Sequence, residues 1–409
     1  MRRGIWNRLF LISSFGLVGL FLYLVSQETF PEWVGVQRDY YRRLAQVTGD
    51  RSKARTPIKL RQIYLPEFHR VDRCTTCHVG IDNPKMANQP QPFSSHPEVV
   101  PGFLAAHSFN EIGCTVCHQG QGPATMKAHA HGPVPHWEEP LLGHGLTTGS
   151  CTSCHEDVRN LKGAEPLVQA KQLFDEKGCI GCHNLHGKGM LVGPELAETW
   201  RKGTDQFDFR YVKGEHTVAN WVFDHFKDPQ RVVPGYPAMG IPESAMPNYE
   251  FTDEEAQLLT ALVLSFASEE GAEGRPIPAG FKVRSTTPPV KEPVYAFPVE
   301  RGKAVYQKYG CVGCHGVDGR GGIKNKNMEM AEEVPPLIYV AEGFTKEELK
   351  QTIRNGRYPA RSDPHDLAPP LWMPSWKEKI SEEELDALAD YLLSLSPEPR
   401  PQTAKSEGV

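Results

Sequence analysis

Three stretches of this chain have distinct hydrophobic patterns. The run Leu9 to Val25 carries no charge, and as a helix rising ~1.5 Å per residue it would cover most of a ~30 Å hydrocarbon core. Two later stretches repeat apolar residues at helical spacing instead. Their apolar positions are Leu259, Leu262, Val263 and Phe266 in one, and Leu385, Leu388, Ala389 and Leu392 in the other. The pattern predicts one transmembrane helix and two amphipathic helices.

Polar residues that can cap a helix precede both amphipathic stretches. Thr252 with Glu255, and Ser381 with Glu384, form capping boxes. Another short helix is predicted upstream of each, in PLVQAKQLFDEK and VERGKAVYQKY. The repeated plan predicts two similar helical domains, 166–270 and 295–397. Five prolines between them suggest a semi-rigid linker at 271–294.

The chain before residue 166 is organised differently. Pro31 opens a predicted helix, and Arg38 to Arg61 contain eight basic and two acidic residues. Residues 31–61 are therefore predicted to form a basic juxtamembrane helix and connector. Their basic residues either form a solvated face or bind lipid headgroups or a partner subunit. Residues 62–165 show no long periodic helix and predict a loop-rich segment. The predicted fold is mainly α, with an anchor at 1–30 and a disordered tail at 398–409.

The ten cysteines change this picture, because all of them fall in five copies of Cys-x-x-Cys-His. Zinc sites usually need two such pairs at a modest spacing, and a redox dithiol has no use for the histidine. Cys-x-x-Cys-His is the attachment signature of c-type haem. The attachment residues are Cys74 and Cys77, Cys114 and Cys117, Cys151 and Cys154, Cys179 and Cys182, and Cys311 and Cys314.

The motifs predict five covalently bound c-type haems. The histidine behind each second cysteine then becomes the proximal iron ligand. These ligands are His78, His118, His155, His183 and His315. An iron held on one side needs a second ligand or an open face, and that choice separates electron transfer from catalysis.

Haem attachment also predicts the compartment, since c-type maturation takes place outside the bacterial inner membrane. A signal peptide is the alternative for the N-terminal run, but SQETFPEW offers a poor cleavage site. Arg2, Arg3 and Arg8 favour a cytoplasmic N-terminus, although Arg42 and Arg43 weaken that argument. We expect a single-pass inner-membrane protein whose bulk is periplasmic. The formal charge of −5 and export exclude nucleic acid as a sensible partner.

Both C-terminal units resemble class I cytochrome c domains, with an N-terminal helix, a haem motif, a Met-Pro loop and a C-terminal helix. Residues 1–165 resemble the anchored multihaem cytochrome subunit of bacterial quinol-oxidising complexes of the cytochrome b/c type. The segments RCTTCHVGIDNP, GCTVCHQGQGPA and AHGPVPHW carry that second resemblance. It implies a pentahaem subunit beside membrane cytochrome b-type or other quinol-oxidising subunits.

The resemblance also implies distal ligands. Class I domains place a Met on the distal face, which points to Met246 in AMPNY and Met373 in WMPSW, with Met239 as a rival on the fourth haem. The 62–165 segment is rich in histidine instead. The segments that carry the resemblance hold His96, His107 and His131, our predicted distal ligands there. Other candidates are His136 and His144, then Met86 and Met126, whereas His69 and His129 complete the set of histidines.

The leading functional hypothesis is an electron conduit from quinol oxidation to a soluble cytochrome or a terminal oxidase. His/His haems should have lower potentials than His/Met haems, which gives electrons a direction away from the membrane. One alternative is the cytochrome c subunit of a terminal oxidase. Another is a multihaem reductase or peroxidase, which needs a five-coordinate iron. The sequence shows no substrate site, so an activity of the chain's own stays uncertain.

Overall fold

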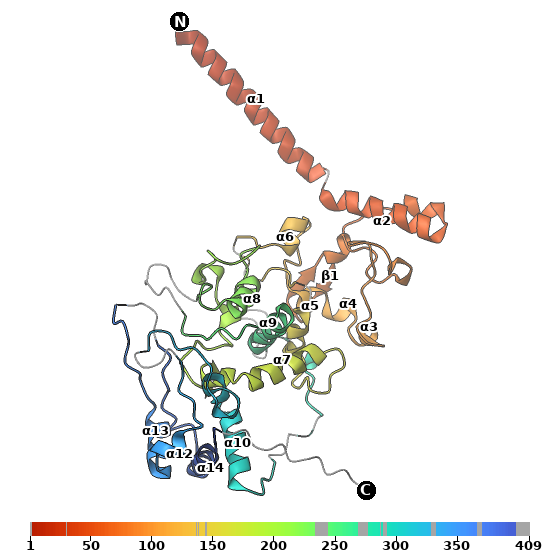
Figure 1. The fold of residues 1–409 in the computed structure, drawn as a ribbon. Coiled ribbons are helices and arrows are strands. Elements are labelled where there is room, and N and C mark those ends of the chain that lie inside the picture. The colour runs from red at the N-terminus through yellow and green to blue at the C-terminus, as the bar shows by residue number, and fades with distance from the viewer. Residues whose placement is uncertain are drawn as a thin grey trace. The chain divides into compact units, whose positions relative to one another are not determined.

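The computed structural model describes residues 2–29, 31–135, 137, 139–143, 145–233, 244–268, 277–286, 288, 293–328, 333–365 and 370–397. These residues are mainly helical, as predicted, with a few very short strands (Figure 1). The chain divides into two compact units, Met1–Leu142 and Gly143–Val409. The predicted 62–165 segment crosses this boundary, and its third haem motif belongs to the second unit.

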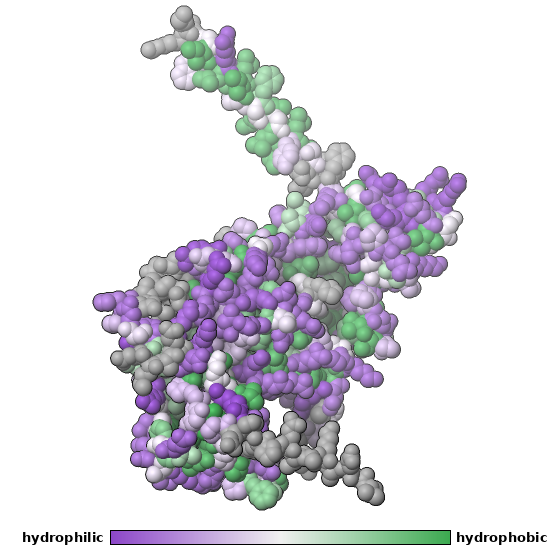
Figure 2. Space-filling view, in the orientation of Figure 1, coloured by the Kyte–Doolittle hydropathy of each residue, from purple (hydrophilic) through white to green (hydrophobic). Residues whose placement is uncertain are grey.

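The N-terminal helix α1 spans Arg2–Thr29. Its segment Gly4–Ser26 has 23 residues and a mean hydropathy of 2.2, which is long and apolar enough to cross a membrane. The described side chains along it are mostly exposed, and Figure 2 shows them as a largely hydrophobic surface. The apolar helix is confirmed, whereas its role as a retained anchor stays a prediction, because a signal sequence shares these properties.

The helix predicted to begin at Pro31 forms as α2, Glu32–Thr48, whereas its juxtamembrane role stays a prediction. Tyr40 and Tyr41 are buried on its inner face. The amide of Gln37, fully buried, donates to the carbonyl oxygens of Lys59 at 2.7 Å and Thr76 at 2.9 Å. Thr76 belongs to the first haem motif, so this helix is fastened directly to that motif.

The rest of the first unit consists of short elements. The strands β1 and β2 pair antiparallel, with Tyr64 opposite Val71. The elements are η1 (Arg51–Arg55), β1 (Ile63–Leu65), β2 (Arg70–Asp72), η2 (Cys74–Thr76), η3 (Pro84–Met86), α3 (Phe103–Ala106), α4 (Phe109–Ile112), α5 (Thr115–His118) and α6 (Lys127–His131). This confirms the loop-rich character predicted for the region.

The second unit contains the two predicted helical domains, each with its own core. The first has α7 (Glu165–Glu176), α8 (Val218–Lys227) and α9 (Asp253–Ser268); the second has α10 (Pro298–Lys308), α13 (Lys346–Asn355) and α14 (Glu382–Leu393). Both capping boxes form, with Thr252 against Glu255 and Ser381 against Glu384. The stripe predicted on α14 lies in one core, and Leu259, Leu262 and Phe266 of α9 lie in the other. Val263 packs in a neighbouring apolar cluster with residues of α8.

Short elements complete this unit. They are η4 (Thr147–Ser153), η5 (Cys179–Gly181), β3 (Asn184–Leu185), β4 (Lys188–Gly189), η6 (Thr199–Arg201), η7 (Thr204–Gln206), η9 (Ala279–Phe281), α11 (Val312–His315), η10 (Val317–Gly319) and α12 (Val340–Gly343).

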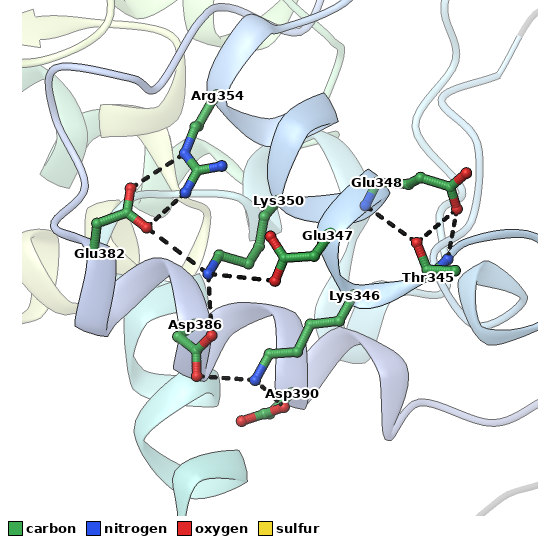
Figure 3. A network of polar contacts seen from close by, with 9 residues as sticks. All are labelled: Thr345, Lys346, Glu347, Glu348, Lys350, Arg354, Glu382, Asp386 and Asp390. Atoms are coloured by element: carbon green, nitrogen blue, oxygen red, sulfur yellow. Dashed lines mark hydrogen bonds and ion pairs between the residues drawn. The ribbon is translucent and has the colours of Figure 1, made fainter.

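A ladder of ion pairs joins α13 to α14 (Figure 3). Cations and carboxylates recur every four residues, which places each set on one helix face. Lys346 lies 2.7 Å from Asp390, and Arg354 lies 2.6 Å from Glu382. Between them, Lys350 contacts Glu347, Glu382 and Asp386. The ladder fixes the register of the two helices around the apolar core beneath it.

Part of the predicted linker is hydrogen-bonded to the third haem motif. Val283 N–H donates to the carbonyl of Cys154 at 2.8 Å, and its own carbonyl accepts from Glu156 N–H at 3.1 Å. Lys282 Nζ donates to the Ser153 carbonyl at 2.7 Å. The described residues 277–286 therefore include a strand-like cover over the third haem motif.

Candidate haem-binding sites

All five motifs adopt the same local turn. In each, the histidine N–H donates to the carbonyl of the first cysteine, at 2.8 to 3.0 Å. This turn brings two half-buried thiols and one imidazole into a single loop. The donor set is the one that covalent haem attachment requires. The attachment residues and proximal ligands themselves stay predictions.

Proline carbonyls orient two of the proximal imidazoles. His183 Nδ1 lies 2.9 Å from the Pro194 carbonyl oxygen, and His315 Nδ1 lies 3.1 Å from that of Pro335. A carbonyl can only accept, so the proton sits on Nδ1 and the Nε2 lone pair remains for a metal. Burial lowers the pKa of both histidines, which favours this neutral form.

The sequence reasoning missed the two prolines, although Gly-Pro-x-Leu and Pro-Pro-Leu follow the motifs at similar places. Gly193 explains part of the first pattern. A Cβ there would lie 2.5 Å from His183 Cε1, so only glycine lets the chain pass this close to the imidazole.

The predicted distal methionines lie in ordered loops. Met373 is half-buried against the core of its domain and exchanges two backbone hydrogen bonds with Arg357, at 2.7 and 2.9 Å. Asn325 clamps the same loop through the backbone of Leu371. Met246 is also half-buried, and its N–H donates to Ser244 Oγ at 3.1 Å. The rival Met239 lies outside the described residues.

His225 on α8 is a second candidate distal ligand for the fourth haem, and sequence reasoning missed it. Its ring stacks on Trp221 at 4.8 Å, and Nδ1 bonds to the Val232 carbonyl. Burial, and to a smaller extent the charge of nearby His183, lower its pKa to about 4. The signal was available in the sequence, because His225 shares the apolar face of its helix with Trp221.

Two pairs of imidazoles lie close together in the first unit, one pair tilted and the other edge-on. The ring centroids of His78 and His131 lie 6.1 Å apart, and those of His118 and His96 lie 6.0 Å apart. Two imidazoles on opposite sides of one metal have centroids roughly 6 Å apart, since each metal–nitrogen bond is about 2 Å. The predicted ligands His96 and His131 are thus brought to two different proximal histidines.

His107 lies behind one of these pairs. Its ring stacks on Phe103 at 4.5 Å, and Phe103 stacks on His96 at 6.3 Å. His96 Nδ1 donates to the Pro97 carbonyl at 2.7 Å, which leaves its Nε2 for a metal. The contacts of His107 therefore support His96, whereas its own role as a ligand stays a prediction.

The remaining candidate ligands differ in how far their side chains are buried. Met86 is fully buried in the apolar core under α2, and Met126 is 45% exposed. His69 and His129 are exposed as well. His136 and His144 lie outside the described residues.

A buried carboxylate joins the first two motifs. Asp72 is fully buried and accepts from Cys114 N–H at 2.6 Å, Thr115 N–H at 2.9 Å and Thr115 Oγ1 at 2.8 Å. It stands two residues before Cys74, so it ties one motif to the start of the next. The thiol of Cys74 hydrogen-bonds to that of Cys114 and raises its pKa strongly.

The third motif packs on the first helical domain. Thr152 Oγ1 donates to the Ser265 carbonyl at 2.9 Å. A Cβ on Gly149 would lie 2.6 Å from the Ala261 carbonyl oxygen. The η4 turn is therefore seated directly against α9.

Comparisons with known proteins support the two C-terminal domains. The cytochrome c family matches residues 167–267 and 299–396. The C subunit of nitric oxide reductase from Stutzerimonas stutzeri is 26% identical over 116 residues, which are 28% of this chain and 68% of that protein. Its counterpart of the same name from Halomonas halodenitrificans is 30% identical over 118 residues, which are 28% and 69%. No solved structure matches the chain. The two predicted cytochrome c domains are confirmed.

Proposed function

Because this chain belongs to the cytochrome c family, we propose that it is a membrane-anchored pentahaem cytochrome. In this proposal it carries electrons from a quinol-oxidising membrane complex to a periplasmic or terminal acceptor. Its five Cys-x-x-Cys-His motifs attach five haems through all ten cysteines. The helix α1 spans the inner membrane, and the rest of the chain lies on the periplasmic side.

The spacing of the imidazoles in the first unit carries the electron-transfer assignment. His78 with His131, and His118 with His96, stand at the separation of two ligands on one iron. An iron with two protein ligands has no open face for a substrate, which favours electron transfer over catalysis. The same spacing supports His131 as the distal ligand of the first haem and His96 as that of the second.

The haems supply reversible one-electron chemistry at iron, and the protein tunes it. Pro194 and Pro335 hold the proximal imidazoles in one tautomer. Met246 and Met373 are the proposed distal ligands of the two C-terminal haems, where a thioether favours reduced iron. Electrons would then pass downhill from the His/His haems to the His/Met haems.

The partner of the first unit is proposed to be a membrane subunit of the cytochrome b type or another quinol-oxidising subunit. The basic residues of 38–61 support this, because Arg38, Arg42, Arg51, Arg55 and Lys59 are exposed close behind α1 in the sequence. They suit anionic headgroups or an acidic partner surface.

A second candidate function follows from the relatives, both of which are named as the C subunit of a nitric oxide reductase. The chain would then deliver electrons to a terminal reductase or oxidase. Purification of the intact complex separates the two functions. A quinol-oxidising subunit beside this chain supports the first, and a catalytic reductase or oxidase subunit supports the second.

Carbon monoxide tests the ligation directly, because it binds reduced haem only where a coordination position opens. We expect the first two haems of the wild-type protein to bind none, and His131→Ala or His96→Ala to make one haem each reactive. His129→Ala is the matched control, since this exposed residue lies on the same short helix as His131. Carbon monoxide binding at those haems in the wild-type protein would contradict the proposal.

A further inference from the structure

The two cytochrome c domains of the second unit meet at their haem motifs. Cys182 Sγ lies 3.8 Å from Cys314 Sγ, and each is the second cysteine of its motif. The hydroxyl of Tyr249 donates to the Gly313 carbonyl at 3.1 Å, and Lys379 Nζ donates to the Gly187 carbonyl at 3.1 Å. Each domain therefore supplies one of these two hydrogen-bond donors to the other.

Glycines permit this approach. A Cβ on Gly181 would lie 2.3 Å from the Gly310 carbonyl oxygen, and one on Gly313 would lie 2.8 Å from that of Gly178. Neither Gly181 nor Gly313 has a positive φ, so their backbone conformation does not require glycine. What requires it is the close passage of one motif's backbone against the other.

The contact is reciprocal. The glycine before each motif packs on the glycine inside the other, because a Cβ on Gly178 would lie 2.6 Å from Gly313 N and one on Gly310 would lie 2.4 Å from Gly181 N. At these four glycines the two motifs are thus related by an approximate local two-fold symmetry. The other three motifs have side chains at the corresponding position, namely Thr76, Val116 and Ser153.

We propose that the haems attached through Cys182 and Cys314 form one fixed, coupled pair, and that electrons pass between them without any movement of the two domains. The proposal rests on haem attachment and electron transfer as proposed above. The two sulfurs, once in thioether bonds, are covalent parts of the two cofactors and lie in van der Waals contact. One electron moves from a ferrous to a ferric iron, and no bond forms or breaks.

Coupling has a measurable consequence. An electron on one haem places charge close to the other in a medium of low dielectric constant, so the second reduction becomes harder. The pair therefore titrates with two apparent potentials that belong to the pair and not to either haem. Two independent domains on a tether would titrate separately.

The test uses the full-length holoprotein. In its oxidised state, electron paramagnetic resonance should show magnetic interaction between the two C-terminal ferric haems, identified as the signals that move in Met246→His and Met373→His. Gly181→Ala and Gly313→Ala should weaken this interaction. Gly343→Ala is the matched control, because a Cβ there would meet no atom within 4 Å and φ is ordinary.

Sharp, non-interacting signals from these two haems in the wild-type protein would overturn the proposal, even if the alanine variants fail to fold. Interaction that survives unchanged in folded Gly181→Ala would also overturn it. Quinol-dependent reduction of the acceptor by the intact complex is measured in parallel. Turnover without magnetic interaction would contradict only the proposed haem pair. Magnetic interaction without turnover would contradict the proposed function and still support the haem pair.

Discussion

The two compact units position their imidazoles by different means. In the first, His96 and His131 come from loops and very short helices, and a buried carboxylate and stacked rings hold the motifs. In the second, helices with apolar cores carry the motifs of both domains, and Pro194 and Pro335 orient the rings. The first unit has a small apolar core under α2, and polar clamps join its motifs in addition. Because a buried group that loses its hydrogen bonds is costly, we expect these clamps to be sensitive to single substitutions.

Exchanging the ligand type between the two units is expected to have the largest effect. Met373→His converts a proposed His/Met haem to the His/His type, so its potential should fall by roughly 0.1–0.3 V, within the ~0.8 V range that axial ligands span. Redox titration of the holoprotein measures this. The near-infrared band of thioether-ligated ferric haem should also decrease.

The same substitution at the fourth haem decides between its two candidate ligands. If Met246 is the ligand, Met246→His lowers the potential and His225→Gln leaves the thioether band intact. The converse result would assign His225 and disprove the predicted ligand.

Acid should destabilise the first helical domain of the second unit through His225. Its pKa of about 4 lies below the ordinary value of 6.5. The unfolded chain therefore binds a proton that the folded chain does not, and stability falls as the pH drops from about 6.5 to 4. The loss is up to roughly 3 kcal/mol, at 1.36 kcal/mol per pKa unit.

Denaturant unfolding followed by far-ultraviolet circular dichroism at several pH values measures this slope. His225→Gln should flatten it. An unchanged slope in that variant would place the acid sensitivity on another group.

Replacing Asp72, the buried carboxylate that clamps the motifs of the first unit, is expected to have the next largest effect on stability. Asp72→Asn keeps the shape but turns an NH₂ group toward backbone donors, so we expect a loss of about 2 kcal/mol, the scale of hydrogen bonds to a charged group. Denaturant unfolding measures it, and Glu67→Gln serves as an exposed control. Equal effects of the two substitutions would show that the clamp contributes little.

Breaking one ion pair of the α13–α14 ladder should have the smallest effect on stability. Arg354→Ala removes an ion pair to a carboxylate that is 65% exposed. Such pairs contribute about 0.2–1 kcal/mol, and salt screens them. Thermal unfolding at low and high ionic strength should show a small difference that shrinks with salt. A loss as large as that of Asp72→Asn would mean that the second unit also depends on polar clamps.

Local sequence patterns alone were enough to predict many of the helices of this protein. The apolar run of α1, the two capping boxes and the apolar stripes of α9 and α14 follow from residues within a few turns of one another. The histidine turn of each motif is equally local, because five consecutive residues form it. These features depend on helix periodicity and capping, which the sequence shows directly.

Only the tertiary structure decided which groups meet. His131 reaches His78, Asp72 reaches Cys114, and Gly181 meets Gly310, each across a long stretch of chain. It also placed the third motif on α9 and showed that Val283 covers that motif. No short-range pattern determines such contacts, because they depend on how separate loops close and pack. The sequence by itself predicted which residues can bind haem, and the packing of the chain decided which of them lie close together.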